Sequence, residues 1–301
     1  MWLTGTTPAF LTPFDKDGEI NYKVVRDMVE FHIANKAAGE YVGGSTGEGF
    51  LLTEEERCKL AETVIDQVKG RIPVIIQVGS LTTAEASRLA AHAEKAGADA
   101  ISSVPPFYFS VGIEGVKGHY AAITAACDLP MYIYNIPGAT GVNVSPALCR
   151  EIVEQSPRVV GMKFTSYNFF EMRQLIDLDI NGKKLNIVSG PDELLVAGQA
   201  MGAHGAIGST YNVLPRLFAD AYDAFNAGDV KKASELQGMG NRVIQTFLGY
   251  QSISALKEMM TLIGLDCGSG RRPQRPLSDE EKGTLKEQLE DIGFFDFAVM
   301  A

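Results

Sequence analysis

Lys163 occupies a position in this sequence where a charged side chain needs a reason. Residues 158–168 read RVVGMKFTSYN, and the run before the lysine has the apolar character of a buried β-strand. Taking an ammonium group out of water costs several kcal/mol unless the group is paired or neutralised. Lys163 therefore has either a structural counter-ion or a chemical task.

The chemical task that suits a buried lysine is Schiff-base catalysis. Burial disfavours the charged form of an amine, and a neutral amine attacks a ketone to form an imine. The protonated imine withdraws electrons from the neighbouring carbon, so that a C–C bond can break or form there without a metal or an organic cofactor. This chemistry needs a proton shuttle, for which Tyr134 and Tyr108 are candidates.

The substrate also needs a group that holds its fixed end. The turn GGSTGEG at 43–49 offers backbone N–H groups and the hydroxyls of Ser45 and Thr46, which could bind a carboxylate near a helix N-terminus. The turn lacks the Gly-Lys-Ser/Thr end of a P-loop and does not match G-x-G-x-x-G. We therefore do not expect nucleotide binding.

Each of these residues also has a purely structural interpretation. Lys163 could be an ion-pair partner inside the fold, and residues 43–49 could be an ordinary tight turn. Tyr134 could be a buried aromatic side chain with a satisfied hydroxyl. Asp192 and Glu193 follow a proline and could complement the dipole of a helix N-terminus.

Short apolar runs alternate with longer helical patterns along the chain. Several of the runs are apolar at consecutive positions, which is typical of parallel strands covered on both faces. The expected strands are 8–11, 41–44, 73–78, 100–104, 130–134, 158–164, 186–189 and 205–209. Between them, Thr53 with Glu56 and Thr82 with Glu85 have the spacing of capping boxes that begin helices.

Eight strands that alternate with helices over residues 1–228 predict a (β/α)8 TIM barrel rather than an open doubly wound sheet. Residues 229–301 carry helical patterns and no convincing strand. We expect this segment, the C-terminal extension, to pack on the barrel as part of the same domain. Arg271, Arg272 and Arg275 lie in it, and we expect them to form a solvated loop.

Polar residues collect where the expected strands end. In a (β/α)8 barrel the carboxyl ends of the strands meet at one mouth, where the catalytic groups lie. The residues that should converge there are Ser45, Thr46, Tyr108, Tyr134, Lys163, Thr165, Ser189, Asp192, Glu193 and Ser209.

Composition excludes several classes of partner. The net charge of −10 and the pI near 5.0 argue against nucleic acid and anionic membrane surfaces. Four cysteines without a CxxC pair predict a reducing, cytoplasmic setting. The four histidines show no metal-ligand spacing, and the N-terminus lacks the pattern of a signal peptide. We expect a soluble protein with a small-molecule substrate and no metal.

Four motifs together resemble a known family. They are GGSTGE (43–48), YNIPGATG (134–141), GMKFTS (161–166) and GAIGSTYN (205–212). Their order and spacing resemble the pyruvate-dependent class I aldolases, the family of N-acetylneuraminate lyases and dihydrodipicolinate synthases, from about residue 5 to the end. The resemblance implies a (β/α)8 barrel, a Schiff-base lysine and a homotetramer built as a dimer of dimers.

The resemblance also implies roles for individual residues. Lys163 matches the lysine that binds pyruvate, and Tyr134 matches the tyrosine that moves protons between the imine adduct and the substrate oxygen. Ser45 and Thr46 match the pair that binds the pyruvate carboxylate, with Ser45 also in the proton relay. Tyr108 matches a relay tyrosine contributed by a neighbouring subunit.

The second substrate is indicated by positions that differ between family members. Ala139 stands where dihydrodipicolinate synthases usually have an arginine that binds a second carboxylate. SGPDELL (189–195) resembles the lyase segment that binds sugar hydroxyls, and the matching polar residues are Thr165, Ser189, Asp192, Glu193 and Ser209. The sequence departs from the lyase pattern at Pro191, where an aromatic residue is common, and at Tyr167 and Asn168.

The resemblance therefore implies an aldolase that reversibly cleaves N-acetylneuraminate, a sialic acid, to pyruvate and N-acetylmannosamine. The alternative within the same chemistry is an aldolase, dehydratase or synthase acting on another 2-oxo acid, including dihydrodipicolinate synthase. An alternative of another class is a non-catalytic, ligand-binding barrel, against which Lys163 and Tyr134 argue.

Overall fold

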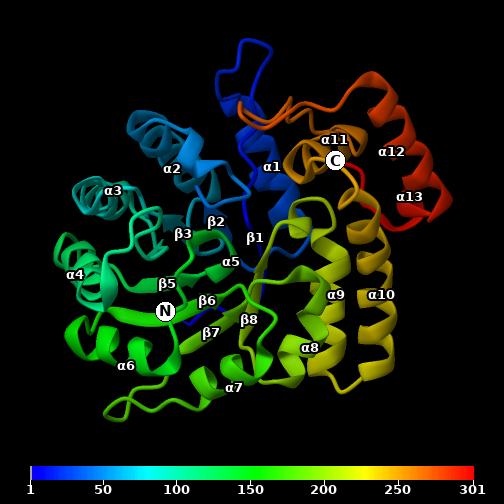
Figure 1. Cartoon of the computed structure of the whole chain (residues 1–301). Helices are drawn as coiled ribbons and strands as arrows, with labels where there is room; N and C mark the ends of the chain where they lie inside the picture. Colours follow the sequence, from blue (N-terminus) through cyan, green and yellow to red (C-terminus); the bar gives the residue numbers. More distant parts are fainter. Residues whose placement is uncertain (1) are drawn as a thin grey trace.

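The computed structural model describes residues 2–301, and within them eight parallel strands form a barrel (Figure 1). The order β1-β8-β7-β6-β5-β4-β3-β2 follows the chain, and the ring closes where Ala9 forms a parallel bridge with Tyr41. The strands are β1 (Gly5–Pro8), β2 (Glu40–Val42), β3 (Val74–Gln77), β4 (Ala100–Ser103), β5 (Met131–Asn135), β6 (Val159–Phe164), β7 (Asn186–Ser189) and β8 (Gly205–Gly208). The predicted (β/α)8 barrel is confirmed.

Helices connect the strands, and further helices continue beyond β8. Figure 1 shows α10 to α13, coloured yellow to red, gathered on one side of the barrel beside α9. Within residues 2–301, every helix is too short or too polar to cross a membrane. The helices are α1 (Tyr22–Ala34), α2 (Glu54–Val68), α3 (Thr83–Ala96), α4 (Gly112–Ala125), α5 (Pro137–Thr140), α6 (Pro146–Gln155), α7 (Phe169–Asp177), α8 (Leu195–Ala200), α9 (Pro215–Asn226), α10 (Val230–Phe247), α11 (Ser252–Leu262), α12 (Asp279–Asp291) and α13 (Phe294–Phe297), with short 3₁₀ turns η1 (Gly49–Leu51), η2 (Asp192–Leu194) and η3 (Thr210–Asn212).

The first strand was predicted too late in the chain. We expected residues 8–11, whereas β1 pairs with β8 over Gly5–Pro8. The apolar residues that suggested the strand lie mostly after β1. There the chain bonds to β2 instead of β8, since Phe10 N–H donates to the Tyr41 carbonyl at 2.9 Å. The two threonines of β1 are polar but buried, and so the apolar pattern did not reveal them.

The strands separate two cores because successive side chains point to opposite faces. One core lies between the sheet and the helices, and a smaller one fills the barrel interior. Inside the barrel Tyr41 Oη donates to Ser102 Oγ at 3.0 Å, and Tyr132 Oη donates to Asn186 Oδ1 at 2.7 Å. The interior is therefore packed and hydrogen-bonded, which gives the site above it a rigid floor.

Helix starts follow the capping signals with one difference. Thr53 and Glu56 form the full capping box of α2. Thr82 accepts a hydrogen bond from the Glu85 N–H, but the Glu85 carboxylate accepts instead from Ser80 Oγ at 2.6 Å. The second predicted box is therefore half formed, because a nearer hydroxyl takes the carboxylate.

Arg271 is not in a solvated loop as we expected. Its guanidinium donates two hydrogen bonds to Glu56, at 2.7 and 2.8 Å, and a further one to the Leu51 carbonyl. The Arg271 contact holds the pKa of Glu56 below its usual range. The ion pair joins residues 215 positions apart, and so no local pattern could have revealed it.

Two glycine substitutions test the packing of the barrel. A Cβ on Gly161 would lie 2.2 Å from the Asn186 carbonyl oxygen and 2.6 Å from the Tyr132 ring. We expect Gly161→Ala to lower the free energy of unfolding by about 1–3 kcal/mol through overpacking. The matched control is Gly283→Ala in the exposed face of α12, where a Cβ meets nothing within 4 Å. Gly283→Ala should raise the free energy of unfolding by about 0.5–1 kcal/mol. If urea unfolding shows equal effects of the two substitutions, the tight packing around Gly161 is contradicted.

Candidate functional site

Lys163 and Tyr134 lie side by side at the inner face of the barrel. They are register partners on β6 and β5. Lys163 Nζ lies 4.1 Å from the centroid of the Tyr134 ring and 4.5 Å from that of Tyr41. Both residues are almost fully buried, with exposures of 4% and 3%. An amine and a phenol therefore meet in a site from which most water is excluded.

The surroundings of Lys163 do not support its interpretation as an interior ion-pair partner. Among residues 2–301 the fully buried contacts between an acidic and a basic side chain are Glu48–Lys257 and His32–Glu40, and the second is an ion pair only when His32 is protonated. Aromatic ring faces attract a cation but do not neutralise it. The same residues include no group of three or more His, Cys, Asp or Glu side chains arranged to hold a metal ion.

A cavity of about 690 Å³ opens above this pair, at the carboxyl ends of the strands. Six of the predicted site residues line it: Ser45, Thr46, Thr165, Asp192, Glu193 and Ser209. Lys163 lies deeper, two positions before Thr165 on the same chain segment. The space above the lysine is large enough for a small-molecule substrate, since ligand cavities typically measure about 300–1,000 Å³.

The turn after β2 brings Ser45 and Thr46 to the cavity. Two glycines make its tight path possible, since a Cβ on Gly47 would lie 2.6 Å from the Phe10 carbonyl oxygen and one on Gly49 would lie 1.9 Å from that of Gly43. The Gly47 carbonyl accepts a hydrogen bond from Thr12 Oγ1 at 2.6 Å. The turn is thus packed against the segment that follows β1, and Ser45 and Thr46 line the cavity.

Asp192 connects β7 to β8 in the wall of the cavity. Its Oδ2 accepts hydrogen bonds from the Thr210 N–H and the Thr210 hydroxyl, both at 2.7 Å, and from Ser209 Oγ at 3.1 Å. Burial raises the pKa of Asp192, and the hydrogen bonds from Thr210 oppose that shift. Asp192 is therefore a buried acceptor that fixes the turn after β8, rather than a cap of its own helix.

Glu193 has a different environment although it is the next residue. It is partly exposed, and Glu193 Oε1 accepts a hydrogen bond from Tyr167 Oη at 2.5 Å. The contact raises the pKa of Tyr167, whose exposure is 72%. Glu193 and Tyr167 together form a polar rim that remains accessible to a ligand.

Four predicted site residues do not line the cavity: Lys163 and Tyr134 are buried below it, and Ser189 and Tyr108 lie elsewhere. Ser189 directly follows Val188, which faces the barrel interior, and so Ser189 faces α8, where a Cβ on Gly198 would lie 3.1 Å from its Oγ. Tyr108 lies in the loop after β4, is 84% exposed, and packs edge-on against the ring of Phe109. Tyr108 is therefore exposed at the surface and does not line the cavity of its own chain.

The C-terminal extension supplies a wall of the cavity that sequence reasoning missed. The lining residues from this segment are Ile244, Phe247, Leu248, Ser252, Ile253, Leu256 and Gln274. The helical patterns of residues 229–301 predict only that this segment packs on the barrel. Periodicity reveals which positions are apolar, but it does not reveal whether they cover a core or a ligand.

The model of the dihydrodipicolinate synthetase family matches residues 2–292. This range includes the barrel and most of the C-terminal extension. A match that covers nearly the whole chain extends the similarity well beyond the four short motifs.

Individual relatives agree with the family match. The N-acetylneuraminate lyase of Rhizobium meliloti is 35% identical over 292 residues, which are 97% of this chain and 96% of the relative. The solved N-acetylneuraminate lyase of Proteus mirabilis has a TM-score of 0.92 and 32% identity, and covers 98% of this chain and 100% of its own. A prophage protein of the dihydrodipicolinic acid synthase family from Escherichia coli K12, solved in complex with pyruvate, has a TM-score of 0.90 and 27% identity, and covers 96% of this chain and 98% of its own.

The two neighbouring acids of the cavity should differ in their effect on stability. Asp192→Ala leaves three donors without their acceptor, and should lower the free energy of unfolding by at least about 1–3 kcal/mol. Glu193→Ala removes a side-chain contact to an exposed tyrosine, and should change it by less than about 1 kcal/mol. Urea unfolding of both variants measures this difference. Equal destabilisation would mean that Asp192 does not hold the wall of the cavity.

Proposed function

The chain belongs to the dihydrodipicolinate synthetase family of pyruvate-dependent class I aldolases and lyases, and on that premise we propose that it reversibly cleaves N-acetylneuraminate to pyruvate and N-acetylmannosamine. The observation that carries this proposal is the buried contact between Lys163 and Tyr134 beneath a cavity lined with hydroxyl and carboxyl groups. The rim supplies acceptors for a polyhydroxylated substrate.

In the proposed reaction the Lys163 amine attacks the C2 ketone of the open-chain sugar acid, and water leaves as the imine forms. As the imine forms, Tyr134 gives its phenol proton to the departing hydroxyl, and the resulting phenolate then takes the proton of the C4 hydroxyl. The C3–C4 bond then breaks, the aldehyde leaves, and the protonated imine takes up the electron pair as an enamine. Protonation at C3 and hydrolysis of the imine release pyruvate and restore Lys163.

The geometry supports these roles. Tyr134 and Lys163 are neighbours on a rigid parallel ladder, which keeps acid–base group and nucleophile together with little loss of entropy. Ser45 and Thr46 approach the same cavity from β2, where they can bind the carboxylate beside the reacting ketone. Among residues 2–301 no carboxylate lies within ion-pair distance of the Lys163 amine, which leaves the amine available for imine formation.

The polar rim favours a sugar as the second product. Glu193 and Ser209 present a carboxylate and a hydroxyl group, which pair well with the hydroxyls of a sugar. Ala139 offers no cation for a second carboxylate, and so the rim favours N-acetylneuraminate over the substrates of a dihydrodipicolinate synthase. The second candidate is an aldolase for another 2-oxo sugar acid, because Tyr167 alters the rim.

We further propose a homotetramer built as a dimer of dimers, in which Tyr108 enters the proton relay of a neighbouring subunit. The exposed position of Tyr108 supports this arrangement, since its loop carries further exposed apolar side chains. Phe109 packs on Tyr108, Val111 and Ile113 follow in the chain, and Phe50 packs on Phe107 of the same loop. An aromatic patch of this kind is typical of a contact between subunits.

Trapping tests the Schiff base. Sodium borohydride added in the presence of pyruvate should attach a three-carbon acid to Lys163 through a secondary amine, and peptide mass spectrometry locates it. Lys163→Met should abolish both labelling and turnover while the protein remains folded. Lys257 is an internal control, since it is equally buried but should stay unmodified. A pyruvate label on another lysine, or none on Lys163, would reject the mechanism; full folding with no turnover in the unaltered protein would favour a binding barrel.

A panel of 2-oxo acids tests the substrate. We expect pyruvate release to be fastest with N-acetylneuraminate, and slower with unacetylated and shorter 2-oxo sugar acids. Condensation of pyruvate with aspartate semialdehyde should be slower by about tenfold or more, because the second carboxylate lacks its cation. If pyruvate is released from another 2-oxo sugar acid and not from N-acetylneuraminate, the second candidate, an aldolase for that other acid, replaces the first.

A further inference from the structure

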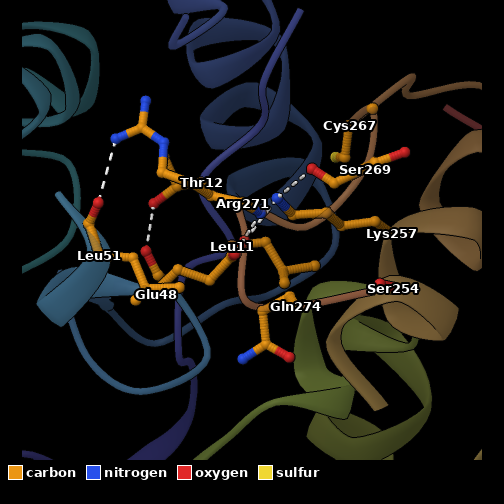
Figure 2. A network of polar contacts seen from close by, with 12 residues as sticks. Leu11, Thr12, Glu48, Leu51, Ser254, Lys257, Cys267, Ser269, Arg271 and Gln274 are labelled. Atoms are coloured by element: carbon orange, nitrogen blue, oxygen red, sulfur yellow. Dashed lines mark hydrogen bonds and ion pairs between the residues drawn. The ribbon is translucent and has the colours of Figure 1, made fainter. Parts of the chain in front are cut away.

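A second buried lysine lies close to the cavity, and the proposed reaction does not use it. Lys257 on α11 has an exposure of 0%, and its Nζ lies 2.6 Å from Glu48 Oε1. Figure 2 shows Lys257 pointing from the C-terminal region toward Glu48, which follows β2. The pair therefore joins the C-terminal extension to the turn that carries Ser45 and Thr46.

Glu48 has a backbone conformation that a residue with a side chain rarely adopts. Its φ of 55° and ψ of 29° lie in the left-handed region. Outside glycine this region is disfavoured, and residues held there are found where the surroundings fix them for a functional reason. A glycine would relax this position, and so the side chain of Glu48 must contribute something that offsets the strain.

Residues of the C-terminal extension hold both oxygens of the Glu48 carboxylate. Lys257 contacts Oε1, and the backbone N–H of Arg271 donates to Oε2 at 2.7 Å. Lys257 Nζ also donates to the Ser269 carbonyl at 3.2 Å and lies 4.1 Å from the centroid of the Phe14 ring. Burial lowers the pKa of Lys257, and the Glu48 carboxylate opposes this shift. A charged contact enclosed in this way is short and little screened by salt.

Glu48 is hydrogen-bonded to the backbone of Ser45, one of the two candidate residues for binding the substrate carboxylate. Glu48 N–H donates to the Ser45 carbonyl at 3.1 Å, and Gly49 N–H donates to the Gly44 carbonyl at 3.1 Å. Rotation of the backbone at Glu48 would therefore move Ser45 and Thr46. On the other side of the pair, Leu256 precedes Lys257 and lines the same cavity. The contact thus fixes two walls of the cavity relative to each other.

A purely structural role of the Glu48–Lys257 pair would not explain the left-handed backbone of Glu48. An ion pair that merely fills a core can often be replaced by apolar residues without loss of stability. His32 and Glu40 form a comparable buried contact at the start of β2, with His32 Nδ1 2.9 Å from Glu40 Oε1, and Glu40 lies in regular strand conformation. The left-handed backbone distinguishes Glu48 from Glu40 and connects its carboxylate to the site.

We propose that the Glu48–Lys257 ion pair positions Ser45 and Thr46 for binding of the substrate carboxylate, and that the C-terminal extension thereby controls the affinity for pyruvate. This inference rests on the proposed function, because it takes pyruvate as the ligand. Glu48 and Lys257 act through the turn and do not touch the reacting atoms.

The test measures the pyruvate concentration that gives half-maximal borohydride labelling of Lys163, together with thermal unfolding. We expect Glu48→Gln and Lys257→Met each to raise that concentration about tenfold or more, since small displacements of binding groups are costly. The maximal extent of labelling should stay near that of the unaltered protein, because Lys163 and Tyr134 are untouched. A general loss of structure would also lower the maximal labelling of Lys163, and so it would not change the half-saturating pyruvate concentration alone.

Two further variants complete the test. Glu40→Gln alters the comparison contact between His32 and Glu40 at the start of β2. It should lower the unfolding temperature and change the half-saturating pyruvate concentration by less than twofold. The double variant Glu48→Gln, Lys257→Met leaves no buried charge unpaired, so it should recover stability while pyruvate affinity stays weak. It also carries the test if either single variant fails to fold.

The outcomes distinguish this inference from the proposed function. If pyruvate does not label the unaltered protein at Lys163, the proposed function fails. If labelling is normal there and half-saturation is unchanged in the folded Glu48 or Lys257 variants, the positioning role is wrong. Recovery of both stability and affinity in the double variant would also overturn it, because the pair would then be structural alone.

Discussion

The parallel pairing of β5 with β6 brings Tyr134 and Lys163 to the same level of the barrel, and the remaining site is arranged around that contact. In a closed barrel each strand directs alternate side chains inward, so one register determines which groups can meet. Beneath them Tyr41 and Tyr132 fill the interior with satisfied hydroxyls. The amine is thereby held at a packed floor, with open space above it.

Buried cations in this chain are accommodated in different ways. Lys163 lies against two aromatic rings, Lys257 lies against a carboxylate, and Arg57 donates to backbone carbonyls and the side chain of Gln77. Burial lowers the pKa of Arg57 to about 10, which still leaves it charged at neutral pH. The ammonium group of a lysine in an ion pair, such as Lys257, is occupied by the contact with its carboxylate. An amine against ring faces retains its lone-pair chemistry once it loses its proton, which suits a nucleophile.

The C-terminal extension forms part of the cavity as well as part of the core. Helices α10 and α11 supply apolar lining, while Arg271 and Lys257 reach Glu56 and Glu48 near the carboxyl end of β2. Long-range charged contacts of this kind fix the extension in one place, because buried charges have few alternative partners. The opening of the cavity is consequently bounded by segments from both ends of the chain.

Local patterns determined much of this protein. Consecutive apolar runs and capping residues indicated the barrel and its mouth, and the apolar run around Lys163 singled that residue out, because each signal depends on neighbours in sequence or on a regular period. The tertiary structure decided the rest. Ser189 turns away from the cavity, Arg271 pairs across 215 positions, and Lys257 meets Glu48 rather than a substrate. Lys163 and Lys257 look alike as single lysines in apolar stretches, and only three-dimensional pairing distinguishes them, because a charge is stabilised by what lies near it in space.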